Sequence, residues 1–541
     1  MSQQNLCYDL RFEPWIPVER LNGTSDVVSL RDALCEAHCI RRISGEIPGE
    51  NLALLRLLLA LVYCTYYSEL EDMSERDKRT KWKELKVLGA FNSDDVEDYL
   101  ADYPHEFNLF DREHPFYQIP NLTYMGEKQY DPISEFMLDV PKPEKYLFSM
   151  RGANQLNLLS FDLAARYLVV TQAFDTAGIK SPVVGNTSAK GGKAYAPKGA
   201  LGTGWCGALG GIYLEGQNLF ETILYNWVLF LNNRSITTSD DYAPWERDVP
   251  SPNTCQREPT GPVDLLTWQS RRMRLVPSDD SATVCGVIIS YGDVLTPANK
   301  QLFEMMTGWR KSKQQQKKLG TNTPPLMPIA PDTARALWRG LPELLSFSQE
   351  REMVSPGVIS WMQELQDVQS QDDWRFTVRI SCQGVSYGTQ SSVVDDSITD
   401  SIDLRASLLH KNSEDLIKLL SIIENADQAV RVLIQFVQNV EQAQGDKRRS
   451  SDSTAQAARE NIREEAYSAL DELFRRRIAS FPEDETASYC FEWRIETRNI
   501  LRRLAQSYVS RQHLSYFAER DNMSAGKALV WFEQGLTKAL F

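Results

Sequence analysis

The sequence predicts an α+β protein, with a large mixed N-terminal domain of helices and short antiparallel sheets over residues 1–405 and a C-terminal four-helix bundle over residues 406–541. Up to about residue 400, short β-branched segments bounded by glycine alternate with helical segments. Beyond that point, apolar residues recur every three or four positions, as on one face of a helix. The chain has 541 residues, more than a single hydrophobic core usually supports.

The first elements follow from turn and capping residues. An extended segment with prolines leads to a hairpin turn at Asn22-Gly23, and Ser29 is placed to cap a helix. Helical periodicity covers residues 51–67 and 74–88. Prolines within residues 107–120 exclude a long helix there, so we expect a packed loop.

The middle of the chain mixes helices and strands. Helices are expected over residues 161–173, over 218–233 from a cap at Asn218, and over about 333–346. The segment VCGVIISYG is rich in β-branched residues and predicts a strand. Residues 374–396 predict a strand, a turn near 387–390 and a second strand.

The C-terminal part predicts four helices joined by short polar segments. Ser413 caps the first, which runs to about residue 443 and carries its apolar residues on one face. These residues are Leu416, Leu419, Leu420, Ile423, Val430, Leu433, Ile434 and Val437. Further helices are expected over about 455–480, 487–509 and 523–540, and the simplest arrangement is an up-down bundle.

Composition is that of a soluble globular protein, with 42% hydrophobic and 24% charged residues. Nine cysteines are scattered singly, and the N-terminus has no cationic start followed by an apolar segment, so we expect a cytoplasmic location. The most apolar run, Leu52 to Tyr63, is too short to cross a bilayer and contains Arg56. It predicts a buried helix, and no membrane partner is expected.

The formal net charge of −14 argues against a protein that coats nucleic acid with its whole surface. Local basic stretches are candidate interfaces. The only charged side chains between residues 176 and 214 are Lys180, Lys190, Lys193 and Lys198. The second basic stretch consists of Arg310, Lys311, Lys313, Lys317 and Lys318. Solvated loops also carry such residues, but two basic stretches in one acidic chain favour a polyanionic partner, with Arg310, Lys311 and Lys313 as candidate phosphate contacts.

The segment GALGTGWCGALGG, residues 199–211, contains the spacing G-x-G-x-x-G at Gly202, Gly204 and Gly207. Binding of a dinucleotide requires a strand before these glycines, a helix after them and an acidic residue about 20 positions further on. The preceding residues 193–198 contain a proline and two lysines, and residues 210–216 look extended. A nucleotide-dependent enzyme that uses the glycine-rich loop 199–211 therefore stays as the alternative function, and a simple glycine-rich turn is the structural alternative.

Signs of catalysis are weak. The sequence has five histidines and lacks the G-x-S-x-G, H-E-x-x-H and G-x-x-x-x-G-K-[ST] motifs. Cys35, His38 and Cys39 have the spacing of ligands on one helix face, but a structural zinc site needs a fourth ligand. We therefore expect a protein that is not an enzyme, with no catalytic residues, no metal and no cofactor.

Several segments together resemble one family in the same order along nearly the whole chain. They are WIPV at 15–18, EHPF at 113–116, the glycine-rich segment, GVSYGTQSSVV at 384–394 and the terminal helices. The family is CasA, the large subunit of the type I-E CRISPR surveillance complex Cascade. The resemblance implies a subunit that recognises the protospacer-adjacent motif (PAM) from the minor groove of duplex DNA and promotes strand separation and R-loop formation. The implied partners are a guide RNA (crRNA), the double-stranded DNA target, the other Cascade subunits and a helicase-nuclease. A scaffold whose bundle only docks neighbouring subunits is a further alternative.

The resemblance also implies site residues. The family's glycine loop corresponds to the region of Gly199, Gly202 and Gly204, next to Lys193 and Lys198, where glycine lets the main chain approach DNA closely. The family's wedge, a hairpin tip that separates the first base pairs, corresponds to Thr389 and Gln390.

Two further regions are compared with the family. Residues 147–155 resemble a loop near the 5′ end of the guide, so that Phe148 would stack on a base, Arg151 would meet phosphate and Asn154 would lie in the same RNA-binding loop. The region of the family's lysine finger, residues 275–284, instead carries Asp279 and Asp280. This departure from the pattern implies a different motif preference.

Overall fold

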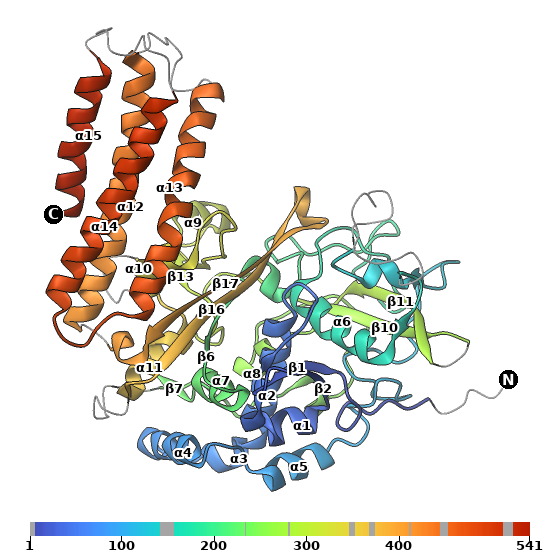
Figure 1. Cartoon of the computed structure of the whole chain (residues 1–541). Coiled ribbons are helices and arrows are strands. Elements are labelled where there is room, and N and C mark those ends of the chain that lie inside the picture. Colours follow the sequence, from blue (N-terminus) through green and yellow to red (C-terminus); the bar gives the residue numbers. More distant parts are fainter. Residues whose placement is uncertain are drawn as a thin grey trace. The chain divides into compact units, whose positions relative to one another are not determined.

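The structure is a computed structural model that forms two compact units. The described residues are 6–140, 156–232, 234–279, 282–345, 352–366, 374–410, 413–443, 453–511 and 523–541. The first unit comprises residues 1–333, 348–365 and 379–400, and the second comprises 334–347, 366–378 and 401–541. Figure 1 shows the fold, with labels on the helices and on several of the strands.

Helices are spread along both units. The helices up to residue 319 are α1 (Leu30–Cys35), α2 (Glu50–Thr65), α3 (Tyr67–Leu70), α4 (Glu75–Leu88), α5 (Ser93–Ala101), α6 (Phe161–Phe174), α7 (Leu219–Asn226), α8 (Pro262–Leu266) and α9 (Lys313–Leu319). The later ones are α10 (Leu337–Leu344), α11 (Gly357–Gln366), α12 (Glu414–Ala443), α13 (Ser453–Ala479), α14 (Thr486–Ser510) and α15 (Ala525–Leu540).

The strands form small sheets. The first sheet has the order β2 (Ser25–Val28), β1 (Ile16–Arg20) and β3 (Ile40–Ile43). The second has the order β10 (Arg271–Pro277), β11 (Thr283–Tyr291) and β4 (Asp131–Pro132), and β5 (Leu159–Ser160) also pairs with β11. The third has the order β14 (Leu326–Pro328), β13 (Trp309–Lys311) and β15 (Met353–Val354). The others are β17 (Val394–Arg405), β16 (Thr377–Tyr387) and β6 (Gly211–Glu215); β7 (Phe230–Leu231) with β8 (Arg234–Ser235); and β12 (Asp293–Val294) with β9 (Cys255–Gln256). The pair β12 and β9 is parallel, whereas the pairs within the larger sheets are antiparallel.

The core of the first unit is built on α2, which is buried on nearly every side. Its Arg56 is 2% exposed and donates to both carboxylate oxygens of Glu304 over 2.9 and 3.0 Å and to the carbonyl oxygen of Leu265 over 2.8 Å. A buried arginine is tolerated because its charge and its N–H groups are paired. The same Glu304 accepts a hydrogen bond of 2.6 Å from the indole N–H of Trp205, which fixes the glycine-rich segment to the core.

The second unit contains the long C-terminal helices, which lie side by side in Figure 1. Helix α12 packs against α13, α14 and α15. The rings of Phe436 and Phe532 lie 4.9 Å apart between α12 and α15, and those of Phe474 and Trp493 lie 4.9 Å apart between α13 and α14. The predicted α+β class with a C-terminal helical bundle is confirmed. Of the apolar residues predicted on the α12 face, Leu420 and Ile434 are half-buried and the rest are buried.

The predicted helix N-caps are confirmed at two positions. The hydroxyl of Ser29 accepts from the N–H of Asp32, and Asn218 accepts from the N–H of Glu221, as expected. The helix predicted over 218–233 was wrong beyond Asn226. The side chain of Asn226 both donates to and accepts from the main chain of Leu214 on β6, and the chain leaves the helical conformation at Trp227.

Candidate nucleic-acid interface

The turn between β16 and β17 presents Thr389 and Gln390 to solvent, since both side chains are exposed. The N–H of Ser392 donates to the carbonyl oxygen of Thr389 over 3.4 Å, and the two residues between them, Gln390 and Ser391, have φ of 57° and 53°. Both residues lie in the left-handed region, which is strained for residues other than glycine, asparagine and aspartate. The turn therefore holds the Gln390 amide at the tip of a hairpin in a conformation that glutamine rarely adopts.

The hairpin tip is attached to the residues that follow α6. The hydroxyl of Tyr387 donates to the carbonyl oxygen of Phe174 over 2.7 Å. The N–H of Ala177 donates to the carbonyl oxygen of Ser391 over 2.8 Å. The predicted wedge residues therefore lie at the end of a hairpin that is attached to residues 174–177.

The glycine-rich segment is attached to the same residues. The N–H of Gly204 donates to the carbonyl oxygen of Asp175 over 2.8 Å. A Cβ at Gly204 would lie 2.5 Å from the main chain of Ala173 and Phe174, and one at Gly202 would lie 3.0 Å from the Cβ of Ala177. Gly202 and Gly204 therefore allow close packing within this chain, which differs from the predicted approach to DNA.

Gly199 differs from these two glycines. Its φ is +89°, which favours glycine, and a Cβ there would meet nothing within 4 Å. The predicted glycine loop thus divides into an open position at Gly199 and packed positions from Gly202 onward.

Arg271 on β10 joins the glycine-rich segment to the residues that follow α6. Its side chain is fully buried and donates to the carbonyl oxygen of Gly202 over 2.6 Å, to that of Thr176 over 3.1 Å, and to the Asp175 carboxylate. The guanidinium also lies 4.7 Å from the ring centre of Tyr291. One buried cation therefore holds the glycine-rich segment and the residues after α6 in a fixed relation.

Asp175 is the anion of this cluster. Burial by itself would raise the pKa of Asp175, but the charges of Lys180, whose Nζ lies 2.7 Å from the carboxylate, and of Arg271 lower it from 3.8 to about 2. Asp175 is therefore ionised at neutral pH, and Lys180 serves in this buried cluster and is not an open cation.

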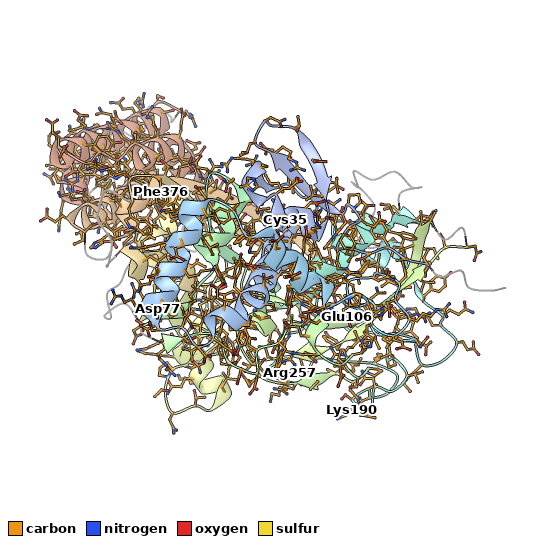
Figure 2. All side chains as sticks on the ribbon, turned by 90° about the horizontal axis from the view of Figure 1, so that it is seen from below. Cys35, Asp77, Glu106, Lys190, Arg257 and Phe376 are labelled. Atoms are coloured by element: carbon orange, nitrogen blue, oxygen red, sulfur yellow. The ribbon has the colours of Figure 1, made fainter. Side chains whose placement is uncertain are left out.

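The remaining lysines of the segment are open. Lys190, Lys193 and Lys198 are exposed, and none has an acidic partner among the residues that the structure describes. Gly191 and Gly192, with φ of 57° and 70°, form a two-residue turn in which Lys190 and Lys193 exchange main-chain hydrogen bonds of 3.0 and 3.2 Å. Figure 2 shows Lys190 at the periphery of its part of the chain. The predicted contacts Lys193 and Lys198 thus have the exposure that phosphate binding requires.

Arg310, Lys311 and Lys313 lie on β13 and at the start of α9. All three are exposed and have no ion pair within the described ranges. Lys317 and Lys318 stand in the last turn of α9, where cations stabilise the helix. No described hydrogen bond or ion pair joins this basic surface to the hairpin tip, so it is a separate candidate contact.

Some predicted positions lie outside the described residues. Phe148, Arg151 and Asn154 belong to residues 141–155, which are not among them, and neither is Asp280. Asp279 is exposed after the end of β10.

Sequence reasoning missed Arg271 and Asp175, which are 96 positions apart, and the Gly-Gly turn at 191–192. A signal existed for the turn, because two glycines between extended segments predict a hairpin. For Arg271 the signal was weaker: adjacent arginines in a strand point to opposite faces, and the structure buries both, with Arg271 1% and Arg272 3% exposed.

The features of a nucleotide-using enzyme are not met at the glycines. Gly204 is followed by the four-residue 3-10 helix Trp205–Ala208 and then by β6, so no α-helix begins there to bind a phosphate. In the part of the chain that the structure describes, no three His, Cys, Asp or Glu side chains are grouped to hold a metal ion. No described helix combines the length and apolar character needed to cross a membrane.

Comparisons with known proteins identify relatives across the chain. The family model for CRISPR-associated protein Cse1 matches residues 9–504. The CRISPR-associated protein CasA/Cse1 of Thermus thermophilus is 30% identical over 297 residues, which are 54% of this chain and about half (52%) of that relative. The crystal structure of Thermobifida fusca Cse1 is 31% identical, with a TM-score of 0.88 over 100% of this chain and 99% of that one. A chain of a CRISPR RNA-guided surveillance complex is 15% identical, with a TM-score of 0.71 over 99% of this chain and 100% of that one, a likeness of fold alone. The resemblance to CasA is thereby confirmed, and the chain belongs to the CRISPR-associated Cse1 family.

Proposed function

We propose that this chain is the large, non-catalytic subunit of a CRISPR RNA-guided surveillance complex, in which it recognises the PAM in duplex DNA and promotes strand separation. The observation that carries the proposal is the attachment of the hairpin tip and the glycine-rich segment to the same residues, Asp175 to Ala177. A wedge and a groove-binding loop must act on adjacent base pairs, so both need to be attached to the same part of the protein.

The chemistry of each part suits its proposed role. Unstacking a base step costs a few kcal/mol. The Gln390 amide can both donate and accept hydrogen bonds, so it can replace hydrogen bonds of an opened base pair. Gly199 lacks a side chain where the main chain is open, and the minor groove admits only narrow groups. Lys193 and Lys198 supply positive charge next to it in a chain of net charge −14.

Membership of the Cse1 family supports the proposed partners. We assign to this chain the guide RNA, the double-stranded DNA target, the other Cascade subunits and a helicase-nuclease that the finished R-loop recruits. Most of the sequence specificity then comes from base pairing of the guide, as in other RNA-guided systems. Arg310, Lys311 and Lys313 form a second phosphate contact, and Phe148, Arg151 and Asn154 contact the guide.

A gel-shift series tests the proposal. The complex is reconstituted with its guide, and duplexes carrying all permutations of the trinucleotide beside the target are compared at fixed salt. We expect affinity to differ strongly between trinucleotides. Equal affinity for all of them would refute motif recognition and leave a scaffold that docks subunits.

The alternative, a nucleotide-dependent enzyme using loop 199–211, is tested by equilibrium dialysis with NAD, FAD and ATP. Saturable binding to wild type that is lost in a Gly199→Leu variant would favour the enzyme over the DNA reader.

A further inference from the structure

The main chain next to Tyr195 is held by an isolated antiparallel bridge between Ala194 and Lys180. Ala194 exchanges main-chain hydrogen bonds of 3.1 and 3.0 Å with Lys180, directly after the turn at Gly191-Gly192. The Ala194 side chain is 1% exposed and packs with Tyr291 and Val294. The bridge and the buried Ala194 side chain therefore set the orientation of the neighbouring side chains.

Alternation places Lys193 and Tyr195 on the face opposite to Ala194. In the antiparallel register set by Ala194 and Lys180, the residue opposite Tyr195 is Ile179. Tyr195 is 50% exposed and Ile179 is 56% exposed. Two large apolar side chains and one cation therefore share an outward face.

Tyr195 has no described interaction within the chain. Among the described residues, neither its ring nor its hydroxyl takes part in a ring contact, a cation–π contact or a hydrogen bond. A half-exposed aromatic ring between Lys193 and Lys198, both open, is the arrangement by which proteins bind single-stranded nucleic acid. The ring stacks on a base while the cations follow the phosphates.

We infer that Tyr195, supported by Ile179, is a stacking platform for an unpaired base of the DNA strand released beside the motif. The position of Tyr195 favours a base of the DNA over a base of the guide RNA. Ile179 lies two residues from Ala177, at most about 7 Å of chain, and Ala177 is bonded to Ser391 at the hairpin tip. A base displaced by the tip is thus released next to the platform. The inference rests on the proposed function for the source of the unpaired base.

The test uses the reconstituted complex and a DNA duplex with a mismatched bubble beside the motif, so that binding does not require opening. Tyr195→Ala is expected to weaken binding roughly 5- to 100-fold, the range for loss of one aromatic stack, while Tyr195→Trp keeps it. The slope of log affinity against log salt stays unchanged in Tyr195→Ala, because no charge is removed. Tyr242→Ala, at a tyrosine that is 47% exposed, is the matched control and is expected to bind like wild type.

A second measurement locates the contact directly. A 5-iodouracil base placed in the bubble should crosslink to Tyr195 under near-ultraviolet light. Wild-type affinity of Tyr195→Ala, together with crosslinking elsewhere or to Tyr195 only from the guide RNA, would overturn the inference. If the wild-type complex shows no preference among trinucleotides, the proposed function fails, and the crosslink from unpaired DNA still decides whether the platform exists.

Discussion

The main-chain N–H of Ala177 donates a hydrogen bond of 2.8 Å to the carbonyl oxygen of Ser391, and this bond joins the segment after α6 to the tip of the β16–β17 hairpin. Because both partners are main-chain groups, side-chain substitutions at the tip leave the bond in place. The side chains of the tip can therefore be tested separately from its position.

Gln390→Ala is expected to leave assembly of the complex intact and to lower the permanganate reactivity of thymines beside the motif, since a methyl group cannot bond to an opened base pair. Gln390→Gly also lacks the amide but relieves the left-handed strain, so it should stabilise the hairpin by about 1 kcal/mol in urea unfolding. Reactivity that matches wild type in both variants would show that the amide is not used.

The two kinds of glycine should respond differently to an added methyl group. Gly204→Ala is expected to lower the free energy of unfolding by about 3 kcal/mol, because its Cβ would overlap the main chain of Ala173 and Phe174. Gly199→Ala should cost about 1 kcal/mol, since only its left-handed conformation is strained. Urea unfolding of both variants measures this, and equal losses would contradict the division of the loop into open and packed positions.

Lys193→Ala combined with Lys198→Ala should flatten the salt dependence of duplex binding. Each phosphate contact contributes about 0.9 to the slope of log affinity against log salt, so the slope should fall in magnitude by about 1.8. Lys81→Ala is the control, because Lys81 already pairs with Glu69 at 2.7 Å. An unchanged slope in the double variant would place the phosphates elsewhere.

Asp175→Asn should destabilise the first unit by about 3–5 kcal/mol at pH 7, because Arg271 and Lys180 lose their buried anion. The pKa of Asp175 lies near 2 in the folded chain and near 3.8 ordinarily, so its stabilisation is complete above about pH 4 and is lost as the pH falls towards 2. Urea unfolding should therefore give a difference between wild type and variant that is constant from pH 5 to 7 and shrinks below pH 4. A difference that already shrinks near pH 6 would contradict the assignment.

The sequence predicted the parts of the fold that local rules decide. The bundle follows from one apolar face per helix, and the hairpin turn near 387–390 follows from a breaker between two β-branched segments. The end of α7 at Asn226 was missed because its side chain bonds to Leu214, a contact that periodicity cannot reveal.

The candidate site was predicted in outline only. Family resemblance indicated Gln390 and the glycines, but not that Gly204 packs against Ala173. The Arg271 and Asp175 pair joins positions 96 residues apart, and no local pattern links them. Long-range charge pairing is decided by the tertiary fold, so it became visible only in the structure.

The anchoring of Trp205 to Glu304 makes the outer part of the glycine-rich segment a replaceable module. Before this anchor, the segment is held by the main-chain hydrogen bonds between Ala194 and Lys180 and by the buried Ala194 side chain, which packs with Tyr291 and Val294. None of these contacts depends on the identity of the exposed side chains. Residues 190–199 can therefore diverge between relatives, or be exchanged between them, while the supporting core stays the same, and such exchange offers a physical route by which one scaffold acquires new motif preferences.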